Sequence, residues 1–282
     1  GGTVHIVDGY LPDQIVEILE SVTTRFLILM PGMVGPFAEF LEERGAKPKG
    51  VGIVGAMADL VPRQDIAAVT SFFNAPYLNT FGATETGLPP ATGNLIPVGI
   101  APVSLSKRQS AFCEVRLVDP EDNDVLVGVP GEVAVRGPTV FSGYWNADEV
   151  NEEDFRGGWF HMGDVMRRNP DGSLDYVDRV KYMIKSGGEN IYPAEIEQVI
   201  SADSRVTEAV VVKQTDQKWG EVPVVFIVRQ DLALTEADVE AICRKDLSSY
   251  KRPKAVYFVE DEDLPRSTTG KVQRHELERR IG

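Results

Sequence analysis

The N-terminal part of the chain alternates short apolar runs with segments in which apolar residues recur at helical spacing. Apolar runs of strand length cover residues 4–7, 25–30, 51–54 and 77–81. Helical spacing follows Pro12-Asp13 and recurs over 37–44, where Gly45 ends the pattern, and over 64–73. This order of strands and helices predicts a parallel sheet with helices on its faces.

From about Val98 to Val177 the helical spacing gives way to short β-rich runs separated by Gly, Pro and Asp. Residues 114–118 and 132–135 are the clearest of these runs, and Asp171-Gly172 is a tight-turn signal between two others. The pattern predicts an antiparallel sheet or a small barrel.

After Arg179 helices and strands are mixed again. A helix is expected from Pro193, strands over 208–213, 222–229 and 256–259, a helix capped by Thr235 and reaching about Leu247, and a closing helix over 276–281. A segment of roughly 100 residues can form a domain by itself, so we expect a separate α+β module here.

The chain has 43 acidic and 29 basic residues and a formal net charge of −14 at pH 7. Such a charge repels phosphate backbones and anionic lipid surfaces, which disfavours nucleic acid and membrane as partners. An anionic substrate would therefore have to be bound by local positive charge.

Cysteine and histidine are sparse. The two cysteines, Cys113 and Cys243, are far apart, and the three histidines show no metal-ligand spacing. The lack of a disulfide framework fits a reducing compartment, so we expect a cytoplasmic protein. No uninterrupted apolar stretch reaches the about 18 residues of a membrane-spanning helix.

Four segments carry groups suited to nucleotide chemistry, and the first is Phe81-Gly82-Ala83-Thr84-Glu85-Thr86-Gly87, directly after a predicted strand. A glycine at the carboxyl end of a strand lets a ligand approach the backbone. Thr84 offers a hydroxyl to phosphate, Glu85 a hard oxygen to Mg²⁺, and Phe81 a flat apolar face to a base. The alternative is a polar, Gly-rich turn without a ligand.

The second segment is Gly157-Gly158-Trp159-Phe160-His161-Met162-Gly163-Asp164. An aspartate after a glycine turn can accept two hydrogen bonds from a ribose diol. The alternative for Asp164 is a turn or helix-capping residue, which is the commoner role of Gly-Asp.

The third segment, residues 178–190, has three cations, Arg179, Lys181 and Lys185, beside the Gly187-Gly188 turn. It lies where the β-rich pattern ends and the α+β module begins. A solvated charged surface is one interpretation, and a hinge next to a binding cleft is the other.

The fourth segment runs from Leu264 to Lys271, and its loop of small hydroxyl residues, 267–269, ends in Gly270-Lys271. It can present one ammonium group to a phosphate. It is not a P-loop, because the leading glycine and the spacing are missing. An exposed surface loop is the alternative.

In this order, the four segments resemble those of the adenylate-forming superfamily, which includes acyl– and aryl–CoA synthetases, luciferases and peptide-synthetase adenylation domains. The resemblance runs from about Val51 to the C-terminus. The segment 192–197, Tyr-Pro-Ala-Glu-Ile-Glu, is most similar to the CoA-ligase branch.

The resemblance implies an α/β fold in several parts. Residues 1–178 would be the C-terminal part of the large AMP-binding domain, with a parallel α/β sheet over 1–97 and a small β-barrel-like subdomain over 98–177. Residues 179–182 would be a hinge centred on Lys181, and residues 183–282 a small, mobile α+β domain.

For the nucleotide, the resemblance implies that Phe81 stacks on adenine beside Gly82. Thr84 would bind the α-phosphate and Glu85 the Mg²⁺. Gly55-Ala56 resembles a segment whose backbone borders the adenine and the acyl pocket, although Met57 stands where relatives have proline.

Other roles follow in the same way. Asp164 and Arg179 would hold the ribose. Lys185 and Gly187-Gly188 would face the active centre during thioester formation. Lys271 matches the lysine required for adenylation.

These roles imply an ATP-dependent carboxylate–CoA ligase. A carboxylate would attack the α-phosphate of ATP and displace pyrophosphate, and the CoA thiolate would then attack the acyl-adenylate and release AMP. ATP, Mg²⁺, CoA and a small carboxylate are the expected cofactors and partners. Fatty, aryl and small branched acids all stay open as substrates.

One family feature is not matched. The Ser/Thr/Gly-rich phosphate loop that precedes the Gly-Ala-Thr-Glu turn in relatives has no counterpart here, and Gly1 falls at what resembles an internal strand. We therefore expect a fragment that is inactive in adenylation by itself. Two alternatives remain: an adenylation domain that loads a carrier protein, and a non-catalytic fragment that binds nucleotide or a partner.

Overall fold

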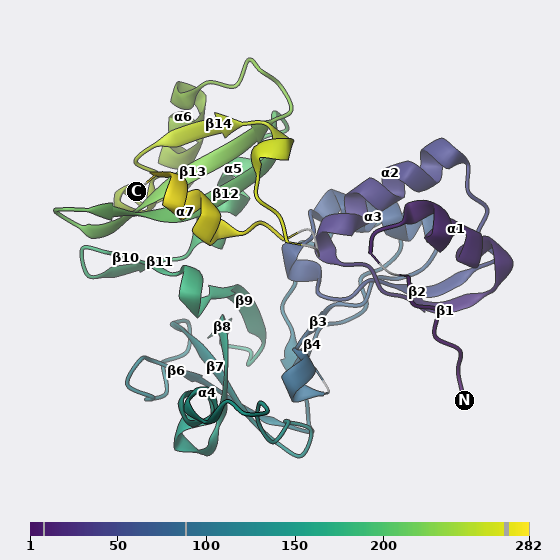
Figure 1. Cartoon of the computed structure of the whole chain (residues 1–282), viewed down its shortest axis with the longest axis horizontal. Coiled ribbons are helices and arrows are strands. Elements are labelled where there is room, and N and C mark those ends of the chain that lie inside the picture. Colours follow the sequence, from purple (N-terminus) through teal and green to yellow (C-terminus); the bar gives the residue numbers. More distant parts are fainter. Residues whose placement is uncertain (8, 88, 268–270, 282) are drawn as a thin grey trace. The chain divides into compact units, whose positions relative to one another are not determined.

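The computed structural model describes residues 1–7, 9–87, 89–267 and 271–281 (Figure 1). The chain forms two compact units. The first contains residues 1–162 and 166–176, and the second contains 163–165, 177–267 and the segment that starts at Lys271. Within the described ranges, every helix is too short or too polar to cross a lipid bilayer.

The first unit begins with the predicted α/β arrangement. Its elements are α1 (Pro12–Ser21), β1 (Thr24–Leu27), η1 (Pro31–Met33), α2 (Val34–Arg44), β2 (Val51–Val54), η2 (Ala58–Leu60) and α3 (Arg63–Phe73). Strands β1 and β2 pair in parallel, and Tyr77 continues the parallel pairing on Val54. Buried residues of all three helices share one core with Leu27 and Val54, which confirms helices packed on a parallel sheet.

The predicted strand over residues 4–7 is wrong. These residues have no regular secondary structure, and Val4 and Ile6 are 81% and 88% exposed. An apolar run becomes a strand only when a neighbouring strand satisfies its backbone groups, and no described strand pairs with this run. The expected strand over 77–81 is also shorter, because only Thr80–Phe81 are in β3.

The β-rich part has two sheets. Strands β3 (Thr80–Phe81), β4 (Ala91–Thr92) and β5 (Arg108–Gln109) pair in that order, with η3 (Thr84–Thr86) between the first two. The second sheet has the order β6 (Glu114–Val118), β7 (Pro130–Arg136), β8 (Phe160–Arg168) and β9 (Leu174–Arg179). Helix α4 (Asp148–Asp154) and η4 (Arg156–Gly158) connect β7 to β8. The antiparallel pairing of β6 with β7 confirms the predicted antiparallel sheet.

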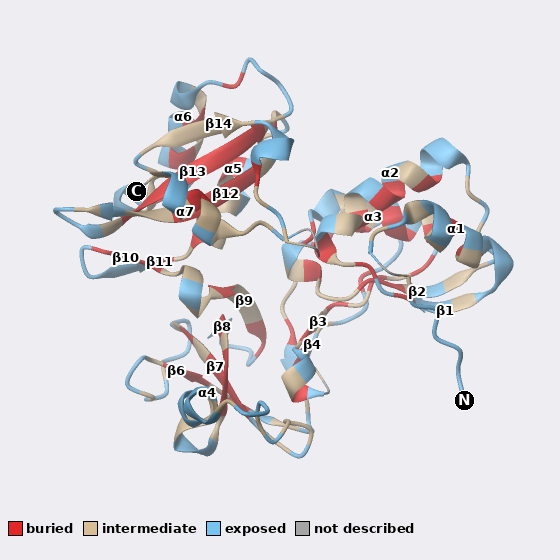
Figure 2. Cartoon of the chain, in the orientation of Figure 1, coloured by how far each residue is buried: buried red, intermediate tan, exposed pale blue. Residues whose placement is uncertain are grey.

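The second unit is the predicted α+β module. Its elements are η5 (Val180–Tyr182), β10 (Ile184–Ser186), β11 (Glu189–Ile191), α5 (Pro193–Ser201), β12 (Val206–Asp216), β13 (Gly220–Arg229), α6 (Glu236–Asp246), η6 (Ser249–Lys251), β14 (Val256–Val259), η7 (Asp261–Asp263) and α7 (Arg274–Ile281). The strand order is β11-β10-β13-β12, and β14 pairs with β13 in parallel. Figure 2 shows β12 and β13 as the most continuously buried strands of this unit.

Alternation along β12 explains why this sheet is covered on both faces. Val211 belongs to a core shared with α5 and α6, whereas Val210 and Val212 belong to a core shared with Leu277 of α7. Successive residues of a strand point to opposite faces. A continuous valine run is therefore the pattern of a strand with a helix on each side.

Candidate active site

The Gly55-Ala56 loop begins at the carboxyl edge of the parallel strands. The N–H of Gly55 donates to the carbonyl of Leu27 at 2.7 Å, and the hydroxyl of Tyr77 donates to the carbonyl of Ala56 at 3.3 Å. Gly55 has φ +71°, and a Cβ there would lie 2.1 Å from Cζ of Tyr77. Only glycine fits this position, so the loop has a fixed path at the edge where α/β sheets bind ligands.

A buried ion pair follows this loop, and the sequence analysis missed it. The ammonium of Lys107, a residue with 0% exposure, lies 2.7 Å from Oδ1 of Asp59 and donates to the carbonyl of Leu105 at 3.0 Å. Burial raises the pKa of Asp59, and the adjacent ammonium opposes that rise. The pair anchors η2 directly after the candidate loop.

The turn from Gly82 to Thr86 is held by the hydroxyl group of Thr86. The N–H of Ala83 donates to Oγ1 of Thr86 at 3.2 Å, and this hydroxyl donates to the carbonyl of Ala83 at 2.9 Å. Thr84 is exposed at the start of η3. The turn therefore fixes its backbone internally and leaves the Thr84 side chain accessible to a ligand.

Glu85 has a partner that the sequence analysis did not find. The hydroxyl of Tyr144 donates to Oε1 of Glu85 at 3.0 Å. The side-chain amide of Asn151 holds the backbone of Tyr144 through contacts of 2.7 and 2.8 Å. Nothing in the spacing of Glu85 and Tyr144, which are 59 residues apart, signals this contact.

The residues present are compatible with Mg²⁺ at Glu85. Mg²⁺ is usually held by one or two carboxylates together with substrate phosphates and waters. Glu85 supplies one carboxylate that is partly accessible. Among the described residues no group of three or more metal-binding side chains occurs, so the phosphates would have to complete the coordination.

Phe81 lies deeper than the sequence analysis anticipated. The residue is 7% exposed and shares a core with residues of β6, β7 and β8. Its ring centroid lies 6.2 Å from that of Tyr176. Stacking on adenine would therefore have to use the small exposed part of the ring.

Asp164 and Arg179 lie together, as a shared ribose site requires. Nε of Arg179 is 3.4 Å from Oδ1 of Asp164, and the two side chains are 42% and 13% exposed. Gly163 before the aspartate has φ +67°, a conformation in which glycine is favoured. The pair places an acceptor and a donor of hydrogen bonds side by side.

Lys185, Gly187 and Gly188 form a hairpin between β10 and β11. The two glycines have φ +58° and +89°, the left-handed conformations of a tight two-residue turn. A Cβ on Gly187 would lie 2.7 Å from Cε3 of Trp219. Lys185 is exposed on the same hairpin, so the turn presents its cation to solvent.

Lys271 is exposed. Its N–H donates to Oγ of Ser267 at 3.2 Å, and its carbonyl accepts from the N–H of Ser267 at 2.8 Å. Thr268, Thr269 and Gly270 of this motif lie outside the described residues. The backbone of Lys271 is thus anchored to the second unit while its side chain reaches solvent.

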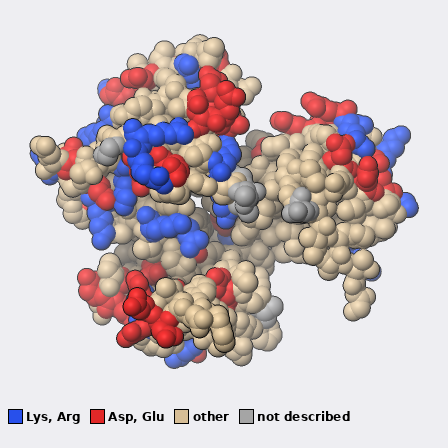
Figure 3. Space-filling view, viewed as in Figure 1, with Lys and Arg blue, Asp and Glu red and all other residues tan. Residues whose placement is uncertain are grey.

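Charge is distributed unevenly over the molecule. On the face shown in Figure 3, lysine and arginine gather over the second unit. The last turn of α7 in this unit carries Arg279 and Arg280. Acidic side chains gather over α4, which contains Asp148, Glu149, Glu152, Glu153 and Asp154. Local positive charge is therefore present despite the net charge of −14.

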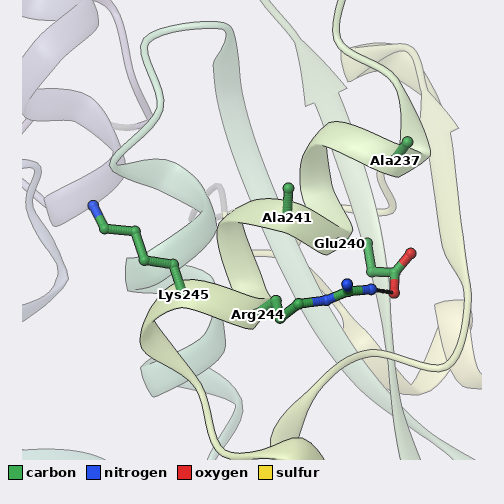
Figure 4. A pocket seen from close by; sticks show the side chains of 5 residues that line it. All are labelled: Ala237, Glu240, Ala241, Arg244 and Lys245. Atoms are coloured by element: carbon green, nitrogen blue, oxygen red, sulfur yellow. Dashed lines mark hydrogen bonds and ion pairs between the residues drawn. The ribbon is translucent and has the colours of Figure 1, made fainter.

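A surface hollow of about 360 Å³ lies on α6 and is lined by Ala237, Glu240, Ala241, Arg244 and Lys245. Figure 4 shows Arg244 paired with Glu240, whereas Lys245 points away from both. None of the candidate residues lines this hollow.

Comparison with known proteins identifies the family. The model of the AMP-binding enzyme family matches residues 1–145, just over half of the chain. The model of the AMP-binding enzyme C-terminal domain matches residues 195–271. The chain belongs to the AMP-binding, adenylate-forming enzyme family.

Similar proteins are CoA ligases. A feruloyl-CoA synthase from an Amycolatopsis species is 33% identical over 291 aligned residues, which cover 100% of this chain and 57% of that protein. A long-chain-fatty-acid–CoA ligase of Escherichia coli O157:H7 is 42% identical over 164 residues, which cover 58% of this chain and 29% of that protein. The chain thus spans less than two thirds of the length of either relative.

A solved structure extends the similarity to the fold. The crystal structure of ATP-bound MatB from Rhodopseudomonas palustris has a TM-score of 0.77 and 28% identity, covering 96% of this chain and 53% of that one. This similarity confirms the predicted fold class, a mixed α/β part followed by a C-terminal α+β domain.

Proposed function

We propose that the full-length protein is an ATP-dependent carboxylate–CoA ligase. The observation that carries the proposal is that both family models match in their expected order and that the relatives described above are CoA ligases. ATP, CoA and a small-molecule carboxylate would be its substrates.

The proposed nucleotide site combines groups from the candidate segments. Thr84 would bind the α-phosphate, and Asp164 with Arg179 would hold the ribose. The Gly55-Ala56 backbone would border adenine and the acyl group, and Phe81 beside Gly82 would contact the base. The exposure of Thr84 and the Asp164–Arg179 contact of 3.4 Å support these roles.

Charge is the main barrier in the first half-reaction, because an anionic carboxylate approaches a polyanion. Lys271 would place its ammonium on the phosphate oxygens, where negative charge develops. Removing one such donor typically costs about 2.7–4 kcal/mol of barrier. Mg²⁺ bound at Glu85 would offset further phosphate charge.

The second half-reaction would use a different part of the small domain from the one that carries Lys271. Residues 179–182 would act as a hinge at Lys181, and residues 183–282 would rotate relative to 1–178. Lys271 would then withdraw while Lys185 and the Gly187-Gly188 turn approach the acyl-adenylate. The exposure of Lys185 and Lys271 supports this assignment.

Turnover of a carboxylate panel tests the proposal. The full-length protein is incubated with ATP, Mg²⁺, CoA and fatty, aryl or small branched acids, and AMP release and acyl-CoA are measured. We expect AMP formation to depend on both the acid and CoA. A phosphopantetheinyl carrier protein that replaces CoA with higher kcat/KM would instead establish the carrier-loading alternative, and no acid-dependent AMP would refute the ligase.

A second candidate is a non-catalytic chain that binds nucleotide or a partner. It is favoured by apolar residues at the surface in and directly after β1, since Phe26 and Ile28 are 42% and 61% exposed and such positions suit association. Calorimetry with AMP and ATP, together with sedimentation analysis of this chain, separates the candidates. Binding or self-association without turnover by the full-length protein would support the second one.

A further inference from the structure

The carboxylate of Glu85 is oriented by a donor that carries no charge. The hydroxyl of Tyr144 donates to Oε1 of Glu85 at 3.0 Å, and Glu85 is half-buried. Within the described ranges, no lysine, arginine or histidine side chain pairs with this carboxylate. The fold therefore fixes one oxygen of Glu85 without neutralising its negative charge.

A second carboxylate of the same unit shows the contrast. Glu132 is paired with the guanidinium of Arg156 at 2.6 Å, so its charge is compensated inside the fold. A guanidinium or ammonium group on a carboxylate repels an incoming divalent cation. A phenol hydroxyl is a neutral donor, so the Tyr144 contact leaves the charge of Glu85 available to such a cation.

Tyr144 is held in place through both its backbone and its ring. Oδ1 of Asn151 in α4 accepts from the N–H of Tyr144 at 2.7 Å, and Nδ2 of Asn151 donates to the carbonyl of Tyr144 at 2.8 Å. The ring centroid of Tyr144 lies 4.8 Å from that of Phe141 at an interplanar angle of 69°. The hydroxyl therefore meets Glu85 from a fixed position.

The segment that carries Tyr144 also binds the backbone of the Glu85 turn. The N–H of Phe141 donates to the carbonyl of Glu85 at 2.8 Å. Phe141 packs in turn on Phe160, with ring centroids 5.1 Å apart. These contacts join the two segments without the Tyr144 hydroxyl, so the hydroxyl contributes the orientation of the Glu85 carboxylate and is not needed to hold the turn.

We propose that Tyr144 is a positioning residue for a divalent cation: its hydroxyl holds the Glu85 carboxylate in the orientation that binds Mg²⁺ together with the phosphates of the nucleotide. The proposal rests on the proposed ligase function, because that function supplies the nucleotide. Hydrogen bonds to a ligating carboxylate orient it and strengthen metal binding. A glutamate that is already ordered also loses less rotamer entropy when the metal binds.

Calorimetry on the full-length protein tests the proposal without turnover. Binding of α,β-methylene-ATP is measured with Mg²⁺ and with EDTA, in the absence of carboxylate and CoA, and the ratio of the two affinities is compared between variants. By linkage, this ratio changes by the same factor as the affinity of the bound complex for Mg²⁺. Tyr144→Phe, which keeps the ring, should lower the ratio by about ten- to a hundredfold and leave the affinity in EDTA unchanged.

Tyr250→Phe is the matched control. It removes the hydroxyl of another exposed tyrosine, since Tyr144 and Tyr250 are 36% and 39% exposed, and Tyr250 lies outside the candidate segments. This variant should leave the ratio unchanged. Asn151→Ala, which frees the backbone of Tyr144, should lower the ratio less than Tyr144→Phe does. Thermal melts show whether each variant folds, and Asn151→Ala carries the test if Tyr144→Phe does not fold.

A double variant shows whether the hydroxyl acts through Glu85. Glu85→Gln should lower the ratio by itself, and the addition of Tyr144→Phe should then change nothing further, because the two changes affect one interaction. A further drop in the double variant would overturn the proposal.

The proposal would also be overturned by an unchanged ratio in folded Tyr144→Phe, by an equal loss of affinity with Mg²⁺ and with EDTA, or by equal affinities of the unchanged protein in the two conditions. Failure of the proposed function is distinguishable, because it would appear as missing acid-dependent AMP release by the full-length protein whatever the ratio shows.

Discussion

Loss of the buried ammonium at Lys107 should destabilise the chain more than any surface charge change. The residue has 0% exposure, and its Nζ lies 2.7 Å from Oδ1 of Asp59. Lys107→Met leaves the carboxylate of Asp59, whose side chain is 14% exposed, without its cation. Removing one partner of a buried ion pair costs about 3–5 kcal/mol. This is a large part of the free energy of unfolding of a typical domain, about 5–15 kcal/mol.

A double variant separates the cost of leaving Asp59 unpaired from the cost of changing the side chain at position 107. Lys107→Met combined with Asp59→Leu removes both charges, and replacing a buried pair by apolar residues is often close to neutral. We therefore expect the double variant to recover most of the about 3–5 kcal/mol lost by the single one. Lys213→Met is the control, because Lys213 and Glu221 are 37% and 31% exposed at 3.3 Å, and such surface pairs contribute about 0–1 kcal/mol.

Equilibrium unfolding in urea, followed by tryptophan fluorescence, measures these free energies. Burial raises the pKa of Asp59, and the Lys107 ammonium opposes that rise. Lys107→Met removes this opposition, so the folded variant binds the proton of Asp59 more readily than the unchanged chain does. The penalty of Lys107→Met should consequently shrink as the pH is lowered. A loss below about 1 kcal/mol, or a double variant less stable than the single one, would refute this reasoning.

Three further changes have defined outcomes. Burial raises the pKa of Glu132, but hydrogen bonds to basic neighbours lower it overall, so its contribution to the free energy of unfolding is present above the ordinary pKa of 4.5 and is lost as the pH falls. Glu132→Gln should therefore weaken the loss of stability below about pH 4.5, measured by urea unfolding at several pH values. Gly55→Ala should lower the melting temperature and weaken AMP binding by the full-length protein, because the new Cβ would lie 2.1 Å from Cζ of Tyr77; unchanged melting and binding would show that the loop adapts. Thr235→Ala should cost about 1 kcal/mol of unfolding free energy by removing a helix cap, whereas Thr235→Ser should cost little, since the N–H of Asp238 donates to the Thr235 hydroxyl.

Local patterns predicted local structure well. The expected strands over 51–54, 114–118 and 256–259 coincide with β2, β6 and β14, because each is a short apolar run bounded by turn residues. Thr235 caps α6 through a reciprocal bond with Asp238, as the spacing indicated. The run over 4–7 is also short and apolar, but no described strand pairs with it. A single apolar run does not reveal whether another strand will form hydrogen bonds with it.

In the candidate site, too, the sequence predicted local turns but not the contacts between residues far apart in the chain. The turns at Gly187-Gly188 and Gly163-Asp164 were visible because their conformations need particular residues in a row. The contacts of Glu85 with Tyr144 and of Arg274 with Glu197 join residues 59 and 77 positions apart. A single sequence carries no signal for such pairs, so the residues that position the chemistry had to come from the structure.

Separate assays of the two half-reactions test the central claim, that Lys271 serves the adenylation step of a carboxylate–CoA ligase. Carboxylate-dependent ATP–pyrophosphate exchange and thioester formation from supplied acyl-adenylate are measured for the full-length protein, Lys271→Ala and Lys245→Ala. The control lysine is on α6 and points away from Glu240 and Arg244 (Figure 4). We predict that Lys271→Ala abolishes exchange but largely retains thioester formation, with Lys245→Ala unchanged in both; equal loss of both half-reactions in Lys271→Ala would contradict the account.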